Sequence, residues 1–185
     1  MRIIGGSAGS LRLQCPKGLQ IRPTTDIIRE SLFNSLGPRV VEAAFCDLYA
    51  GCGGVGIEAA SRGARPVVFI ERDARAIAAV RANLEHAHLT EHAVLIRGPV
   101  LARYAEAAER HGPFAVVFAD PPYGLAELPE LARRLVLEGE GLAQDGLVVI
   151  QHSGRQELTG LPEPDRIKQF GESALSFFEV TGGSR

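Results

Sequence analysis

The 185-residue sequence lacks any long apolar run. A membrane-spanning helix needs ~20 consecutive apolar residues, so we expect no membrane association. A secretory leader pattern is also missing, because Arg2 is followed by only a short apolar pair and then by Gly5 and Gly6. We therefore expect a cytoplasmic protein. An apolar share of 45% and a charged share of 23% are ordinary for a globular chain.

Cysteine is scarce, and its spacing excludes two common kinds of site. The three cysteines are Cys15, Cys46 and Cys52. An odd number without CxxC spacing favours neither a disulfide framework nor a zinc site, so we expect reduced, buried thiols. The histidines His86, His88 and His92 form a cluster in sequence, but the first two would point to different helix faces, and no Cys or Asp completes a ligand set. We expect no metal.

The formal net charge of −2 excludes a generally cationic surface for nucleic acid. The distribution is uneven, however. Residues 1–39 hold six basic and two acidic side chains, a net charge of +4, and the remainder holds 14 basic and 20 acidic ones, a net charge of −6. A basic N-terminal arm on an acidic body is typical of a phosphate-facing surface. The alternative is an arm that is merely solvated.

The length fits one domain, and its pattern is a strict alternation of short apolar runs with amphipathic segments. The runs predict strands at Ala44–Tyr49, Val67–Ile70, Val94–Ile96, Phe114–Ala119 and Leu147–Gln151. The amphipathic segments predict helices near Val55–Ser61, Ala74–Leu84, Leu101–Arg110 and Leu128–Val136. Two further strands, Arg166–Phe170 and Leu175–Val180, have no helix between them and indicate an antiparallel edge hairpin. The whole predicts an α/β fold with a doubly wound, mostly parallel, seven-stranded sheet.

The first 39 residues do not follow this alternation. Residues 1–4 and 11–14 flank a Gly/Ser-rich loop and predict a β-hairpin. Thr24 or Thr25 can cap a helix that runs to about Leu36 and ends at Gly37. We therefore divide the chain into an N-terminal extension, residues 1–39, and a main domain, residues 40–185.

A glycine-rich loop follows the first sheet strand. Gly51, Gly53 and Gly56 match G-x-G-x-x-G, and Glu71 ends the next strand about 20 residues later. Glycines let the backbone approach a nucleoside, and the acidic residue accepts hydrogen bonds from ribose hydroxyls. Asp47, four residues before Gly51, is placed to face a positive charge, which favours S-adenosylmethionine over NAD. The alternative is a glycine-rich turn without a ligand.

A second candidate site follows the strand Phe114–Ala119. This strand ends abruptly at Asp120-Pro121-Pro122-Tyr123, because two prolines cannot donate to a sheet. The Asp120 carboxylate, the proline carbonyls and the Tyr123 ring would then lie at the carboxyl end of a strand, where open α/β sheets bind ligands. Such a group suits a flat ring that carries an NH2 group. The alternative is a Pro-Pro turn with a surface tyrosine.

These segments resemble the RsmD-type methyltransferases, which methylate the exocyclic N2 of a guanine in 16S ribosomal RNA. The resemblance covers nearly the whole chain. It is carried by Arg2–Gly6, Arg22–Asp26, Arg29–Asn34, the glycine loop with Gly56–Ala64, and Asp120–Tyr123. It implies S-adenosylmethionine as cofactor, held by Thr24, Asp47, Tyr49, Gly51, Gly53, Glu71, Arg72 and Asp120. It implies a target-base site at Asp120, Pro121, Pro122 and Tyr123, and an RNA-facing arm with Arg2, Arg12 and Arg22. One departure is Arg97–Val100, which lacks the Asp or Asn that such enzymes often use to read adenine.

The expected partner is 16S rRNA within an assembled or assembling small ribosomal subunit, since so small an arm must borrow specificity from the shape of its target. We expect a monomer. A DNA adenine or cytosine amino-methyltransferase is the alternative enzyme, but only about 40 residues lie outside the sheet core for target recognition. A protein glutamine methyltransferase would more usually carry Asn in place of Asp120. The alternative from another class is a non-catalytic RNA-binding ribosome-assembly factor.

Overall fold

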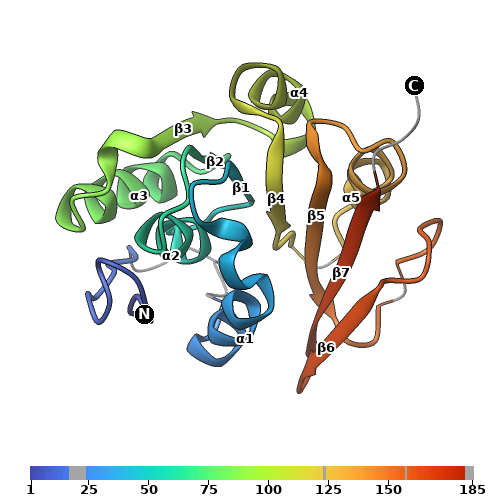
Figure 1. The fold of residues 1–185 in the computed structure, drawn as a ribbon, viewed down its shortest axis with the longest axis horizontal. Coiled ribbons are helices and arrows are strands. Elements are labelled where there is room, and N and C mark those ends of the chain that lie inside the picture. Colours follow the sequence, from blue (N-terminus) through green and yellow to red (C-terminus); the bar gives the residue numbers. More distant parts are fainter. Residues whose placement is uncertain (17–23, 123, 157, 182–185) are drawn as a thin grey trace.

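The computed structural model describes residues 1–16, 24–122, 124–156 and 158–181. Its centre is a seven-stranded sheet with the order β3-β2-β1-β4-β5-β7-β6 (Figure 1). The strands are β1 (Phe45–Leu48), β2 (Val67–Glu71), β3 (Ala93–Arg97), β4 (Phe114–Ala119), β5 (Leu142–Ser153), β6 (Arg166–Phe170) and β7 (Ser173–Thr181). Strands β1 to β5 pair in parallel, whereas β7 pairs antiparallel with both β5 and β6. The predicted doubly wound, mostly parallel sheet with a final antiparallel hairpin is confirmed.

One helix precedes the first strand, and the others connect the parallel strands. The helices are α1 (Asp26–Leu36), α2 (Gly54–Ser61), α3 (Ala74–His86), α4 (Val100–His111) and α5 (Leu128–Ala132), which continues as the π-helical turn η3 (Arg133–Leu137). Short 3-10 turns lie at η1 (Gly37–Val40) and η2 (Thr90–His92). None of the helices in the described ranges has the length and apolar character needed to cross a membrane.

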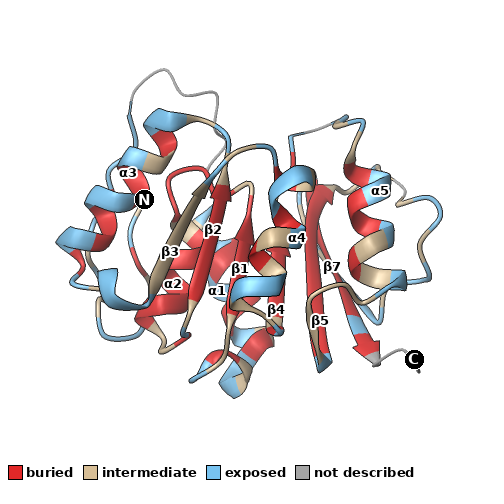
Figure 2. Ribbon diagram, turned by 90° about the horizontal axis from the view of Figure 1, so that it is seen from above, coloured by how far each residue is buried: buried red, intermediate tan, exposed pale blue. Residues whose placement is uncertain are grey.

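The sheet separates two hydrophobic cores, because successive side chains of a strand point to opposite faces. On β4, Val116 and Phe118 pack with residues of α1, α2 and α3 on one face. Val117 and Ala119 pack with residues of α4 and α5 on the other face. Figure 2 shows the result: the central strands are buried along their length, and the helices expose only their outer sides.

Helix α1 begins as its sequence predicts. The Thr25 side chain accepts a hydrogen bond from the Ile28 amide at 3.4 Å and caps the helix. Gly37 follows the last residue with φ +55°, a left-handed conformation that favours glycine. Ile28, Leu32 and Phe33 are buried against the sheet, so the helix belongs to the same core as α2 and α3.

The N-terminal arm, residues 1–16, forms a narrow loop with little sheet structure of its own. Its two sides meet at one antiparallel bridge, between Arg2 and Arg12. Backbone hydrogen bonds from Ile3 to Leu11 (2.9 Å) and from Leu13 to Met1 (3.0 Å) extend this pairing. Ile3 and Leu13 are buried in the core. The predicted hairpin is therefore present as a turn with a minimal ladder, and its position depends on the main domain.

The expectation of three reduced thiols is wrong for two of them. Cys15 and Cys52 form a disulfide, with their Cα atoms 5.6 Å apart, whereas Cys46 is a free, buried thiol as expected. The two bonded residues are 37 positions apart in sequence. Their proximity follows from the arm docking beside the glycine loop, and no local spacing rule contains that information.

Candidate active site

A pocket opens at the carboxyl ends of β1 and β4. Strand β1 has β2 on one side and β4 on the other, so the connections leaving β1 and β4 run to opposite sides of this point. Open α/β sheets bind ligands in the crevice at such a switch point. The described residues that line it are Met1, Cys15, Thr24, Asp47, Tyr49, Ala50, Gly51, Cys52, Gly54, Val55, Phe118 and Asp120.

Asp47 lies at the base of this pocket. It is 2% exposed, and its Oδ2 accepts a hydrogen bond from the Gly56 amide at 2.7 Å. Burial raises the pKa of Asp47 to about 8, the Gly56 hydrogen bond opposes this shift, and the charges of Asp120 and Glu71 add to it. A side chain at position 56 has no room, because its Cβ would lie 2.9 Å from Asp47 Oδ2 and against the Phe69 ring. Asp47 is thus a buried acid on β1 that accepts a hydrogen bond from the first turn of α2.

The glycine loop is fixed from its other side by Glu71 at the end of β2. Glu71 Oε2 accepts from the Gly51 amide and Oε1 accepts from the Asp73 amide, both at 2.9 Å. Gly51 and Gly53 have φ angles of +55° and +83°, which side chains rarely adopt. The loop conformation therefore depends on glycine at these two positions and on one acidic residue 20 positions after Gly51.

Tyr49 borders the same pocket from the end of β1. Its φ angle is +61°, and its hydroxyl donates to Glu127 Oε1 at 3.3 Å, just before α5. Burial, with the adjacent Glu127 charge, raises the pKa of Tyr49. The phenol therefore stays protonated and acts as a hydrogen-bond donor.

Asp120 stands at the opposite wall, directly after β4. Its backbone amide donates to the Leu48 carbonyl of β1 at 3.4 Å. Its Oδ2 accepts a hydrogen bond from the Thr24 hydroxyl at 3.2 Å, and Thr24 is itself buried. Pro121 is buried and Pro122 is exposed. The carboxylate is thereby held by the segment that precedes α1.

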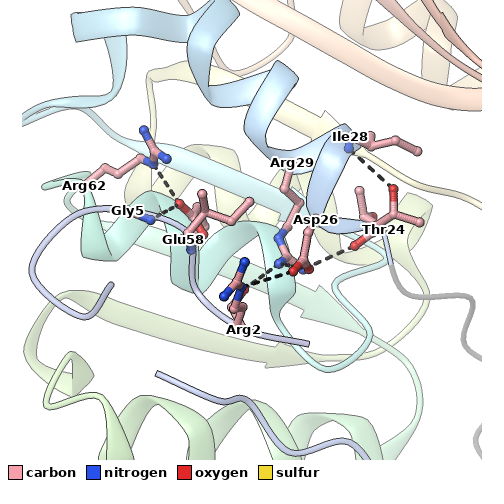
Figure 3. Close-up of polar contacts among 10 residues, drawn as sticks. Arg2, Gly5, Thr24, Asp26, Ile28, Arg29, Glu58 and Arg62 are labelled. Atoms are coloured by element: carbon pink, nitrogen blue, oxygen red, sulfur yellow. Dashed lines mark hydrogen bonds and ion pairs between the residues drawn. The ribbon is translucent and has the colours of Figure 1, made fainter. Parts of the chain in front are cut away.

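Buried polar side chains of α2 and α3 dock the arm onto this site. Glu58, 0% exposed, accepts from the amides of Ile4 (2.7 Å) and Gly5 (2.9 Å), as Figure 3 shows for Gly5. Asn83 accepts from the Gln14 amide at 2.8 Å. Its amide group donates back to the Gln14 carbonyl (2.9 Å) and to the Cys52 carbonyl (3.2 Å). The arm and the glycine loop are therefore joined by hydrogen bonds as well as by the disulfide.

The structure brings five of the predicted site residues into one pocket: Thr24, Asp47, Tyr49, Gly51 and Asp120. Glu71 and Gly53 are adjoining parts of the loop, whereas Arg72 is exposed and lies outside the described lining. Arg2 and Arg12 are exposed on the arm. Arg22 and Tyr123 lie outside the described residues.

Sequence reasoning missed several residues that build the site: Arg29, Glu58, Asn83 and the pair Cys15 and Cys52. Asp26 and Arg29 have the i, i+3 spacing of a helical ion pair, which is a weak signal for Arg29. Glu58 and Arg62 have the i, i+4 spacing of a helical ion pair, but nothing local indicates that Glu58 or Asn83 binds the arm, because their partners in the arm are 53 to 69 positions away. In the described part of the chain, no three His, Cys, Asp or Glu side chains gather where they could hold a metal.

The sheet order, the glycine loop and the acidic ends of β1 and β4 define a Rossmann-like fold of the methyltransferase class. A solved structure from Thermus thermophilus, described as a hypothetical protein, superposes with a TM-score of 0.83 at 33% identity, over 97% of this chain and 99% of that one. Residues 1–179 match the family described as Conserved hypothetical protein 95. The chain belongs to this RsmD-type family, as the resemblance in sequence predicted.

Curated relatives agree with this assignment. The chain is 40% identical to the Bacillus subtilis (strain 168) protein YlbH over 158 residues, 85% of each chain. It is 33% identical to "Ribosomal RNA small subunit methyltransferase D" of Escherichia coli (strain K12) over 163 residues, which are 88% of this chain and 79% of that one. A Salinibacter ruber RNA methyltransferase, solved with S-adenosyl-L-homocysteine, shares the fold with a TM-score of 0.66 at 21% identity, over 89% of this chain and 97% of that one.

Proposed function

We propose that the protein transfers the methyl group of S-adenosylmethionine to the exocyclic N2 amine of a guanine in 16S ribosomal RNA. The observation that carries the proposal is the pocket that joins the glycine-loop end of β1 to the Asp120-Pro121 end of β4. The first wall suits a nucleoside donor with a positive charge, and the second suits an acceptor with an NH2 group. The names of the relatives supply the choice of small-subunit ribosomal RNA.

The residues of the first wall fit the donor. S-adenosylmethionine supplies an electrophilic methyl group on a positively charged sulfur. Asp47 is a buried carboxyl whose anionic form a nearby positive charge would favour. Each Glu71 oxygen accepts one amide hydrogen bond and retains a lone pair for a ribose hydroxyl. We assign Thr24, Tyr49, Gly51, Gly53 and Arg72 to the rest of the donor site.

The second wall fits an aromatic amine. The amine is a poor nucleophile, because its lone pair is delocalised into the ring. Asp120 and the Pro121 carbonyl can accept its two N–H groups and turn the lone pair toward the methyl carbon. These hydrogen bonds strengthen as positive charge develops on the nitrogen, so they favour the transition state. The two proline carbonyls are rigid acceptors, since the pyrrolidine ring fixes the backbone φ angle of each proline.

The lone pair then forms the N–C bond as the S–C bond breaks, which leaves a neutral thioether. Asp120 need not remove a proton first, since the neutral amine is a very weak acid. After methylation the nitrogen is strongly acidic, and its proton passes to Asp120 or to water. We assign Tyr123 to stacking on the base, and orientation of this kind can supply roughly 7–11 kcal/mol. A base within a duplex must be flipped out or already be single-stranded.

The exposed arginines of the arm support RNA as the substrate, and we propose that the protein acts on it in the cytoplasm. The Arg2 side chain is 68% exposed, and Arg12 is exposed on the same arm. We assign these two, with Arg22, to RNA phosphates, and residues 1–39 to an RNA-facing extension of the main domain at 40–185. An arm this small favours an assembled or assembling small subunit over free RNA. We propose a monomer.

The test is methyl transfer from labelled S-adenosylmethionine to small ribosomal subunits from cells that lack this protein, followed by nucleoside analysis. We expect label in N2-methylguanosine. Asp120→Ala should abolish it but leave donor binding measurable, because Asp47 and Glu71 remain. Asp145→Asn is the matched control, because Asp145 is exposed near the start of β5. Strand β5 runs parallel to β4, so its start lies at the opposite end of the sheet from Asp120.

Four outcomes would overturn parts of the proposal. Label in DNA or protein alone would replace the acceptor. Full transfer by Asp120→Ala would remove Asp120 from the reaction. If the wild-type protein bound the donor without any transfer while Asp120→Ala supported normal subunit assembly in cells, that pair of results would favour a non-catalytic assembly factor. Equal rates on protein-free rRNA and on subunits would exclude the preference for assembled particles.

A further inference from the structure

Arg29 is the largest fully buried side chain in the described residues, and it carries a charge. Burying a guanidinium costs free energy unless its N–H groups are paired. Burial lowers the pKa of Arg29, and the charges of Asp26 and Glu58 oppose that shift. Arg29 also lies next to Gly54, which lines the pocket. The groups to which its N–H atoms donate therefore bear on the geometry of the site.

The guanidinium connects three segments (Figure 3). Nη2 donates to the Arg2 carbonyl of the arm at 2.5 Å and to Asp26 Oδ1 at 2.8 Å. Nη1 donates to the Thr24 carbonyl at 3.2 Å. The same Nη1 lies against the glycine loop, since a Cβ on Gly54 would be 3.3 Å from it. Arg29 therefore fixes Thr24 relative to both the arm and the donor loop.

Thr24 is the link from Arg29 to the reacting group. Its backbone carbonyl is bound by Arg29, and its side-chain hydroxyl donates to Asp120 Oδ2 at 3.2 Å. The Asp120 carboxylate can accept the amine N–H, and so aim the nitrogen lone pair at the methyl carbon, only when its plane has the right orientation. A backbone anchor on Thr24 sets where that hydroxyl stands, and with it the plane of the Asp120 carboxylate.

We infer that Arg29 is a positioning residue for methyl transfer, which orients Asp120 through Thr24 and ties that orientation to the docked N-terminal arm. This role rests on the proposed function of Asp120 as the acceptor of the amine N–H. Lysine cannot replace Arg29, because one ammonium group cannot match the planar fork that binds the Thr24 carbonyl, the Arg2 carbonyl and Asp26 together.

The first experiment measures kcat and KM on small subunits for Arg29→Lys, Thr24→Val and the double variant. Each single variant should lower kcat by about 10- to 100-fold, the loss that slight misplacement of a reacting group causes. KM for the subunit should change less than about threefold, because the interaction acts on the transition state rather than on subunit binding. The double variant should be no slower than the worse single one, because both act on the same hydrogen bond.

Arg62→Lys is the matched control. Arg62 also pairs with a buried carboxylate of the arm-docking site, Glu58 at 2.8 Å, and packs over the Phe33 ring. It has no described contact with Thr24, so its kcat should stay near the wild-type value. Asp26→Asn is the second route, in case Arg29→Lys does not fold. The Asp26 side chain is 47% exposed, and its loss weakens one anchor of the guanidinium without emptying a buried site.

A spectroscopic measurement tests the orientation of Asp120 by Arg29 without depending on which molecule accepts the methyl group. The 13C shift of the Asp120 carboxyl carbon, read without RNA, should move in the same direction in Asp26→Asn and Thr24→Val, and not in Arg62→Lys. If the loss of kcat in the double variant equals the product of the two single losses, Arg29 does not act through Thr24. An unchanged carbon shift in Asp26→Asn, or a loss of stability with normal kcat, would reduce Arg29 to a structural residue.

Discussion

Opening the bond between Cys15 and Cys52 should destabilise the fold by a calculable amount. The two residues are 37 positions apart. In the chain-entropy description, a closed loop of that length removes about 13 cal/mol/K from the unfolded ensemble, or about 4 kcal/mol at 25 °C. The Asn83 hydrogen bonds to Gln14 and Cys52 use backbone groups and not the sulfur atoms. The folded arm should therefore stay docked after reduction, and the loss should appear mainly through the unfolded chain.

The assay is urea unfolding with and without a thiol reductant, with the number of free thiols measured in each sample. We expect the free energy of unfolding to fall by up to about 4 kcal/mol on reduction. Cys15→Ser is the control: it should match the reduced protein and no longer respond to reductant. Cys46 is buried and unpaired, so it should not contribute. An unchanged midpoint with three free thiols would refute the reasoning.

Three further predictions concern the buried acids and the packing around them. Because the folded pKa of Asp47 is raised to about 8, the folded state holds a proton that the unfolded chain releases near pH 4. Stability should therefore fall between about pH 4 and pH 8, by at most about 1.4 kcal/mol per unit, and Asp47→Asn should flatten that slope in urea titrations. Gly56→Ala forces a Cβ against Phe69 and should cost about 1–3 kcal/mol in the same assay, whereas normal stability would contradict the packing. Glu58→Ala removes both acceptor oxygens and should release the Ile4 and Gly5 amides, seen as lost hydrogen-exchange protection confined to the arm; unaltered protection would contradict the docking.

Most of the fold could be predicted, because its signals are local. The apolar runs of β1 to β4 and the amphipathic spacing of α2 to α4 match the observed bounds within about two residues. Strand β5 is longer than predicted, because its first half, around Asp145, is not apolar and pairs with β7 there. The predicted hairpin of the arm overstates its ladder, because a Gly/Ser-rich loop between residues 1–4 and 11–14 does not reveal that a single bridge forms.

The site could be predicted in part. Glycine spacing and the Asp-Pro-Pro sequence found Asp47, Gly51 and Asp120, because such chemistry sits at strand ends that the apolar pattern locates. The groups that hold the arm could not be found. Glu58 and Asn83 lie within ordinary helical segments, and their burial and long-range partners depend on tertiary packing. The same is true of the Cys15 partner, which only the docked arm identifies.

The carboxyl groups of Asp47, Glu71 and Asp120 lie near the ends of three strands, close enough for their charges to interact. In the proposed reaction the donor enters with a positive sulfur and leaves as a neutral thioether. The acidic wall attracts the former more than the latter, and the charge of the donor would drive the proton from Asp47. Methyl transfer removes the positive charge that these carboxylates attract. The demethylated cofactor should therefore compete only weakly with the donor for the site. The same side chains would thus favour donor binding before the reaction and product release after it.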